Sequence, residues 1–397
     1  MAGSITMIAT AVLQLLLLCS FREADAATPH IHTFFYIGHR YTARGNATVA
    51  TGQMYVEHLK PMTVTQKYPV LIIPGNGMSG TNFLNTPDGR DGWADFFLAK
   101  GFQIYIVDPP SRGRSPWHND IDGPQTIFDA QRIERRFTAT RFHKLWPQAS
   151  LHTQWPGNGS MGDKTFDEFY ASVSPSSLSV IQMAQKVKYA GSLLLDKIGP
   201  AILMTHSHAG QYGWILADSR PEQVKAIIAL EPLGPPFVDA VFPPFAATRP
   251  FGLTDIAVEY DPPISVPAEL GKVIASVHLF HVCYRQADPP RRLKNLIGIP
   301  VLILTSEAGY HALYDDCTAD FLRQAGVGVD HIRLEEAGFH GNGHMFFMEK
   351  NNLAIAAGVV LPWMAQRDLA IFSSSPPLSM RGNEGGIPDT ISHRDDL

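Results

Sequence analysis

The sequence has few cysteines and no concentration of positive charge. Only three cysteines occur among 397 residues, and the formal net charge is −5. Lysine and arginine form no cluster or stripe, so we expect no nucleic-acid partner, which would need such a surface against phosphates. No internal repeat is visible. A chain of this length with 45% hydrophobic residues can bury one large core, with or without an inserted cap.

The sequence also lacks a hydrophobic run long enough for an ordinary membrane span. The apolar run from Ile5 to Cys19 is short for one, and it leads to Ala24-Asp25-Ala26, which fits the small-x-small rule for signal cleavage. We therefore expect residues 1–26 to be a signal peptide, with a retained signal anchor as the alternative. The mature protein is then secreted or held in the secretory-pathway lumen, with no membrane span.

Two acceptor sites for N-linked glycans agree with passage through a eukaryotic secretory pathway. They are Asn46, in Asn-Ala-Thr, and Asn158, in Asn-Gly-Ser. Signal cleavage leaves Cys283 and Cys317, which can either form one disulfide in an oxidising compartment or remain two buried thiols.

Short strand-like and helix-like segments alternate along the mature chain, which predicts an α/β fold with a mainly parallel sheet covered by helices on both faces. An antiparallel pair opens the fold. The expected strands are residues 33–41, 53–59, 70–73, 103–108, 201–204, 226–230, 301–305 and 331–334, and the expected helices include 93–100, 178–195 and 211–218. We assign residues 27–372 to this domain and the polar, Pro/Gly/Ser-rich residues 373–397 to a disordered tail.

Two long segments interrupt this alternation. Residues 116–177 are rich in aromatic side chains, and residues 234–294 are rich in proline. Both leave the strand ends at which open α/β sheets bind ligands. We expect them to form a cap or lid over the site, and their composition favours a small-molecule substrate with an apolar or aromatic group.

The eleven residues from Ala201 to Gln211, AILMTHSHAGQ, carry the clearest chemical signal. An apolar strand, a sharp turn with Ser207 at its centre and a helix are the parts of a nucleophile elbow, which lifts a serine Oγ above the sheet. The usual G-x-S-x-G pattern has small residues two positions before and after the serine, where this chain has Thr205 and Ala209. The alternative is a serine in an ordinary strand-to-helix turn.

A second alternative is a metallo-hydrolase, because Thr-His-Ser-His also begins the signature T-H-x-H-x-D-H. That signature needs an aspartate and a third histidine to complete its metal sites. Gly210 and Gln211 stand in those two places. We therefore expect no metal and no other cofactor.

A nucleophilic serine needs a base, an orienting acid and an oxyanion hole. The loop from Gly338 to Met345 offers His340 and His344, and we favour His344 because it directly precedes an apolar helix-like run. The oxyanion donors should be the backbone N–H groups of His208, which follows the serine, and of Asn76, in the loop after residues 70–73, with Gly77 as the next candidate in that loop.

The acid has two possible locations from the residues alone. The commonest place follows the strand at residues 301–305, where Glu307, Asp315 and Asp316 are near in sequence. The other is Glu231, at the end of the strand that follows the elbow helix.

The segments HSHAG, ALEP and HGNGHMFFMEKNN, with PGNGMSGTNF and VDPPSRGRS, together resemble the α/β-hydrolase superfamily between Tyr68 and Trp363. They look most like an esterase branch whose acid is a glutamate after the sixth strand. The resemblance implies Ser207 as nucleophile, Glu231 as acid and His344 as base.

These features predict a serine hydrolase that cleaves a carboxylic ester or lactone through an acyl-enzyme on Ser207. The same triad could instead serve a lyase, a C–C hydrolase or an acyl-transfer or cyclisation enzyme. A non-catalytic secreted binding module of the same fold is a further alternative. The sequence does not distinguish oligomeric states.

Overall fold

The computed structural model describes residues 27–371. The expected signal peptide, residues 1–26, and the expected tail, residues 373–397, lie outside these residues. Within residues 27–371, none of the helices combines the length and the hydropathy that a bilayer span requires.

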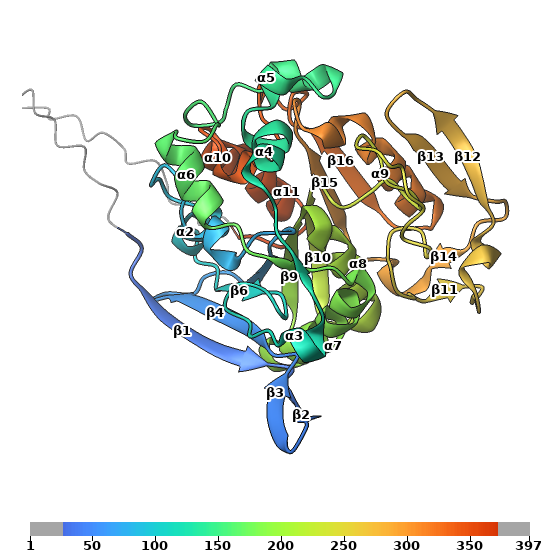
Figure 1. Ribbon diagram of the computed structural model, residues 1–397, viewed down its shortest axis with the longest axis horizontal. Coiled ribbons are helices and arrows are strands. Elements are labelled where there is room, and N and C mark those ends of the chain that lie inside the picture. The colour runs from blue at the N-terminus through green and yellow to red at the C-terminus, as the bar shows by residue number, and fades with distance from the viewer. Residues whose placement is uncertain (1–26, 372–397) are drawn as a thin grey trace, which may run out of the picture.

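An eight-stranded sheet runs through the centre of the protein (Figure 1). Its strand order is β1-β4-β6-β5-β9-β10-β15-β16. β4 runs antiparallel to its neighbours β1 and β6, and the remaining pairs are parallel. The strands are β1 (His30–Ile37), β4 (Met54–Pro61), β5 (Val70–Ile73), β6 (Ile104–Asp108), β9 (Ala201–His206), β10 (Val224–Leu230), β15 (Val301–Thr305) and β16 (Val329–Arg333).

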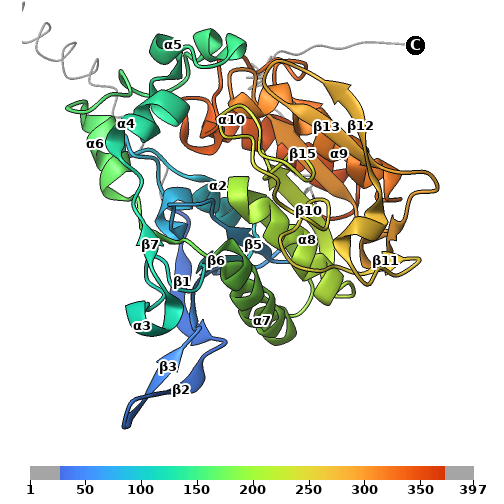
Figure 2. The same ribbon diagram turned by 45° about the vertical axis from the view of Figure 1, so that its right-hand side comes forward.

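Helices cover both faces of this sheet (Figure 2). Alternate residues of each central strand point to opposite faces, so Ile202 and Met204 pack in one hydrophobic core while Ala201 and Leu203 pack in the other. The first core contains α2 (Trp93–Ala99), α10 (Asn352–Ile355) and α11 (Leu361–Ala365), and the second contains α7 (Val180–Ile198), α8 (Gly210–Ser219) and α9 (Asp315–Gln324). Burial on both faces explains why the central strands are continuous apolar runs. The predicted fold class is confirmed.

The first expected strand, residues 33–41, is wrong at its end. The strand stops at Ile37, and a separate hairpin follows, formed by β2 (Arg40–Arg44) and β3 (Ala47–Thr51). Gly38 causes the break, because its φ of 79° lies in the left-handed region that favours glycine. A Cβ on Gly38 would also lie 2.6 Å from the Cβ of Ala190.

The two interrupting segments form short elements beside the sheet. The first contains α3 (Asn119–Asp122), β7 (Gln125–Thr126), α4 (Ala130–Ile133), α5 (Thr140–His143), α6 (Lys164–Ala171) and β8 (Ser176–Ser177). The second contains β11 (Tyr260–Asp261), β12 (Lys272–Val277), β13 (Val282–Gln286) and β14 (Arg292–Leu293). A disulfide between Cys283 and Cys317 joins β13 to α9, so of the two states open for these cysteines the structure has the bridge.

Candidate active site

Ser207 lies at the sharp turn between β9 and α8. β9 ends at His206, residues Ser207–Ala209 form one turn of 3-10 helix, and α8 begins at Gly210. Ser207 has a φ of 54°, a left-handed conformation that is costly for a serine and is typical of a nucleophile elbow. The carbonyl of Ser207 accepts a hydrogen bond from the N–H of Leu233 at 2.8 Å, which holds the turn against the loop after β10.

Two glycines in α8, outside the two positions of the usual elbow pattern, allow the helix to lie close to β9 and to the loop after β10. A Cβ on Gly213, in α8, would lie 3.2 Å from Cγ2 of Thr205. A Cβ on Gly210 would lie 2.5 Å from the ring of Pro232. The β-branched Thr205 therefore fits at the position usually held by glycine, because the helix facing it has a glycine instead.

His344 and Glu231 meet beside this turn, although 113 residues separate them in sequence. The Nδ1 atom of His344 lies 2.5 Å from Oε2 of Glu231. The other carboxylate oxygen of Glu231 accepts hydrogen bonds from the N–H of Ser306 at 2.8 Å and from its hydroxyl at 2.5 Å. Both carboxylate oxygens are therefore satisfied inside the protein, and the imidazole is fixed through Nδ1.

The loop that carries His344 is held by a second carboxylate. Glu349 accepts hydrogen bonds from the backbone N–H of Gly343 and from the amide of Asn342, and it forms a buried pair with His152 at 2.7 Å. These contacts fix the backbone next to the imidazole, as a positioned base requires.

His340 and Glu307, the alternative base and acid, pair with each other instead. Nδ1 of His340 lies 3.1 Å from Oε1 of Glu307, and the His340 side chain is 67% exposed. Glu307 also accepts the N–H of Gly341 at 2.6 Å. Asp315 is bound to His311 and Thr305, and Asp316 to His331 and Arg333.

Burial governs the ionisation of the His344–Glu231 pair. Removal from water lowers the pKa of His344 well below its usual value, and the nearby His311 lowers it further. The same removal from water raises the pKa of Glu231, while His311 and the hydrogen bonds from Ser306 act in the opposite direction. A neutral His344 is the form that can accept a proton.

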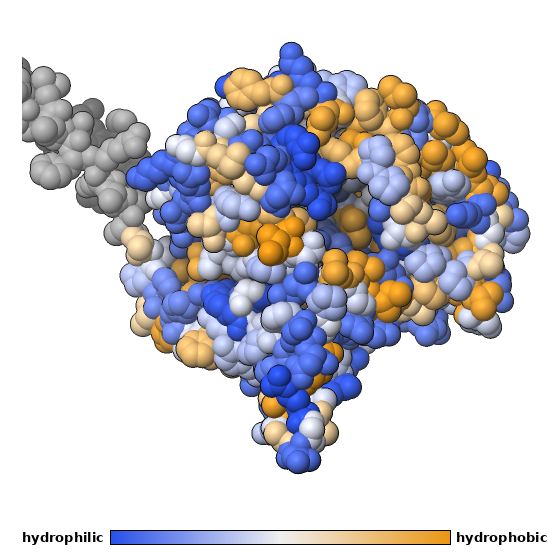
Figure 3. Space-filling view, viewed as in Figure 1, coloured by the Kyte–Doolittle hydropathy of each residue, from blue (hydrophilic) through white to orange (hydrophobic). Residues whose placement is uncertain are grey.

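A pocket of about 240 Å³ opens above Ser207, and Figure 3 shows this face of the protein hollowed near its centre. Ser207 and His344 line it together with both candidate oxyanion residues. The interrupting segments supply much of the remaining wall, with Phe128, Arg132, Ile133, Arg136, Phe137, Phe169 and Val173 from the first and Gly234, Asp239, Ala240 and Phe242 from the second.

The loop after β5 has a backbone donor, the N–H of Asn76, at the pocket. Within residues 27–371 the N–H of Asn76 has no hydrogen-bond partner, whereas that of its neighbour Gly77 donates to Oγ of Ser176 at 3.1 Å. His208 directly follows the serine, and burial lowers the pKa of its imidazole to about 3, so this side chain is neutral.

Several residues of the site gave no sequence signal of their own. Tyr310 lines the pocket with its ring centroid 5.0 Å from that of His344, and Phe137 stacks on His344 at 5.4 Å. Ser306, which binds Glu231, occupies the strand end at which an acid was one of the expected alternatives. Its place at the end of that strand is the sequence feature that could have indicated a role for Ser306.

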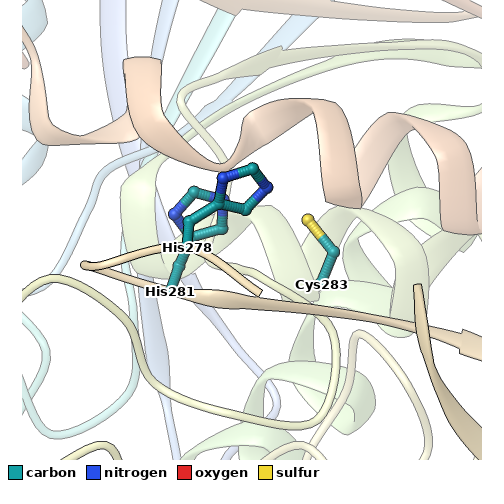
Figure 4. Close-up of side chains that lie close together, drawn as sticks. All are labelled: His278, His281 and Cys283. Atoms are coloured by element: carbon teal, nitrogen blue, oxygen red, sulfur yellow. The ribbon is translucent and has the colours of Figure 1, made fainter. Parts of the chain in front are cut away.

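In the described part of the chain, residues 27–371, two side-chain clusters have the composition of a metal site. The first is Glu231, His311 and His344, in which both carboxylate oxygens of Glu231, both ring nitrogens of His311 and Nδ1 of His344 already lie in hydrogen bonds. The second is His278, His281 and Cys283 (Figure 4). The sulfur of Cys283 forms the disulfide with Cys317, so only the two histidines of this cluster remain as metal ligands.

The two expected glycan acceptors are both exposed. Asn46 lies in the turn between β2 and β3, and Asn158 lies in a loop of the first interrupting segment.

Comparisons with known proteins agree with this architecture. No protein-family model matches the chain. A protein of Fungal sp. (strain ATCC 74256), named "Probable secreted lipase phiG", is 48% identical over 361 residues, which cover 89% of this chain and 96% of that protein. The solved structure of a novel bacterial esterase is similar with a TM-score of 0.55 and 22% identity, over 86% of this chain and 98% of the esterase, and supports the fold.

These similarities bear out three of the expectations from the sequence. The α/β-hydrolase superfamily is confirmed, as are ester hydrolysis and secretion. The finer expectation of a glutamate acid stays a prediction. With 48% identity over most of both chains, this protein belongs to the same family as the fungal probable secreted lipase and is a carboxylic ester hydrolase.

Proposed function

We propose that this carboxylic ester hydrolase works through an acyl-enzyme on Ser207, with His344 as the base and Glu231 as the acid. The observation that carries the proposal is the buried 2.5 Å contact between Nδ1 of His344 and Glu231. It leaves Nε2 of His344 as the nitrogen available toward the pocket that Ser207 also lines.

The reaction follows the chemistry of a serine triad. Nε2 of His344 takes the Ser207 proton as Oγ attacks the ester carbonyl, and Glu231 stabilises the imidazolium that forms. The N–H groups of Asn76 and His208 hold the oxyanion. The imidazolium then gives its proton to the leaving alcohol as the C–O bond breaks. In the second half, His344 takes a proton from water, the resulting hydroxide attacks the acyl-enzyme, and Ser207 regains its proton as the carboxylic acid departs.

The substrate we propose is a small ester with an apolar or aromatic part. Aromatic side chains from both interrupting segments line the pocket, among them Phe128, Phe137 and Phe242, and such rings bury apolar groups. The lipase name of the fungal relative also favours an apolar ester. We further propose that residues 116–177 and 234–294 act as a cap and that Asn46 and Asn158 carry glycans.

The test is active-site labelling of the secreted protein with a fluorophosphonate, followed by peptide mapping. We expect modification of Ser207 in the wild type, none in Ser207→Ala, and loss of esterase turnover in that variant without loss of folding. His340→Gln serves as the matched control, because His340 is exposed and paired with Glu307; it should label and turn over normally. Turnover that survives Ser207→Ala would refute the mechanism.

A further inference from the structure

Two arginines face the pocket without a partner. Arg132 and Arg136 lie one helical turn apart, in α4 and in the turn that directly follows it, and both line the pocket that holds Ser207. Within residues 27–371 neither guanidinium makes a hydrogen bond or an ion pair with a protein group. Instead each lies over an aromatic ring, Arg132 at 5.2 Å from the centroid of Phe128 and Arg136 at 3.8 Å from that of Phe242.

The acidic side chains nearby form their hydrogen bonds and ion pairs with groups other than the guanidinium groups of Arg132 and Arg136. Asp239 also lines the pocket, but it pairs with the buried Arg249 at 3.1 Å. Glu134 accepts the backbone N–H of Met161, and the exposed Asp129 accepts the backbone N–H of Arg132. Among the residues that line the pocket, the two arginines therefore outnumber the one carboxylate, Asp239, which is itself paired with Arg249.

A partly buried cation without a counter-ion has an unfavourable desolvation free energy. An anion that enters the pocket offsets this free energy through charge-assisted hydrogen bonds. Burial lowers the pKa of Arg136 and the neighbouring Arg132 lowers it further, while Tyr310 and Asp129 act in the opposite direction. Arginine remains charged in proteins under ordinary conditions, so the pair offers a permanent site for a carboxylate.

The rings connect this charge to the reaction centre. Arg136 lies over Phe242, whose centroid is 5.2 Å from that of Tyr310, and the Tyr310 ring is 5.0 Å from that of His344. Arg136 and His344 are thus separated by two aromatic rings along one wall. An ester lying on this wall would place its carbonyl at Ser207 and a remote group at the arginines.

We propose that Arg132 and Arg136 form an anion subsite, and that the substrate is an ester with a free carboxylate separated from the scissile carbonyl by an apolar segment. This inference rests on the proposed function of Ser207 and narrows its substrate class. A neutral ester can still be cleaved, but it lacks the group that the two arginines recognise.

The test compares two esters that differ in one charge. One is the mono-p-nitrophenyl ester of suberic acid, which has a free carboxylate, and the other is the same compound with that carboxylate methylated. We expect the wild type to favour the anionic ester in kcat/KM. Because hydrogen bonds to charged groups are the stronger class, Arg136→Gln and Arg132→Gln should each lower that preference by about 10-fold or more, mainly through KM.

Arg135→Gln is the matched control. Arg135 lies between the two arginines in sequence, but it is exposed and its guanidinium donates to the carbonyl of Gln131. This variant should keep the wild-type preference. High salt should reduce the preference in the wild type and have little effect in Arg136→Gln.

A wild type that cleaves both esters equally, or a preference that both glutamine variants retain, overturns the anion subsite while leaving the proposed function intact. Failure of the proposed function is different: neither ester is cleaved and Ser207 is not labelled. The subsite is then decided by calorimetry with suberate and its dimethyl ester on Ser207→Ala. The anion subsite is supported if Ser207→Ala binds suberate more tightly than the dimethyl ester and if the affinity for suberate falls about 10-fold in the double variant Ser207→Ala/Arg136→Gln. Equal affinity of Ser207→Ala for the two compounds refutes the subsite.

Discussion

His311 stacks on His344, with ring centroids 4.8 Å apart and planes 9° from parallel. Each ring belongs to a separate histidine–carboxylate pair, since Nδ1 of His311 lies 2.9 Å from Asp315 and Nε2 lies 3.0 Å from the hydroxyl of Tyr314. Burial of the His344 ring and the neighbouring ring of His311 both lower the pKa of His344 and so oppose its protonation. The consequence is a base that stays neutral over a wide range of pH.

The pH dependence of kcat/KM should reflect this. The groups facing His344 are Glu231, His206, His311 and Tyr310, and burial lowers the pKa of His344 well below its usual 6.5. A lowered pKa means that the proton is lost at a lower pH, so the active, neutral form persists below pH 6.5. We expect the acidic limb of kcat/KM for an uncharged ester to fall below pH 6.5. A limb above that value in folded enzyme would contradict the expectation, and circular dichroism at each pH gives the control for folding.

Much of the fold could be predicted from the sequence because its signals are local. The strands at residues 70–73 and 301–305 are short apolar runs that end in turn residues, and the structure has both with those bounds. The expected end of β1 is too late, because an isolated glycine in a strand pattern does not by itself show whether the strand ends there. The close approach of Ala190, 152 residues away, leaves no space for a Cβ at residue 38. Periodicity carries no information about such a contact.

Substitution of Glu231 tests the acid. Glu231→Gln keeps the size of the side chain but removes the charge that stabilises the His344 imidazolium, so we expect kcat to fall by about 10³- to 10⁴-fold with little change in KM. Fluorophosphonate labelling should slow in parallel.

Glu307→Gln is the control for this experiment. Glu307 contacts His340 and the backbone of Gly341, so its substitution should leave kcat within a few-fold of wild type. The reverse result, an active Glu231→Gln and an inactive but folded Glu307→Gln, would reassign the acid.

The choice between these two glutamates shows the limit of the sequence. Both follow strands that are neighbours in the sheet, β10 and β15, so position alone leaves both within reach of a histidine loop. The difference arises from the path of that loop, which turns His344 toward Glu231 and leaves His340 with Glu307. The path depends on the contacts of Glu349 with Gly343 and His152, which join segments distant in sequence.

A methyl group at residue 309 should disturb the acid without touching the substrate pocket. A Cβ on Gly309 would lie 2.4 Å from Oγ of Ser306 and 2.6 Å from Oε1 of Glu231. Gly309→Ala should therefore displace the carboxylate, lowering kcat at least 10-fold and destabilising the fold by about 1–3 kcal/mol.

Gly328→Ala is matched to it, because no atom lies within 4 Å of a Cβ at residue 328. Stability by urea unfolding and kcat should both remain near wild type. If the two alanine variants behave alike, the contact between residue 309 and the acid is not the cause of any loss.

The disulfide should stabilise the protein without contributing to catalysis. Cys283 and Cys317 are 34 residues apart, and the chain-entropy model gives about 4 kcal/mol for closing a loop of that length. Both cysteines line a different pocket from the one that holds Ser207. We expect the double variant Cys283→Ala/Cys317→Ala to lose a few kcal/mol in chemical denaturation while keeping kcat at 25 °C. Wild type in reducing agent should show the same loss. A folded double variant with unchanged stability would show that the disulfide does not constrain the unfolded chain. A double variant that folds but has lost its activity would show that β13 is coupled to the active site.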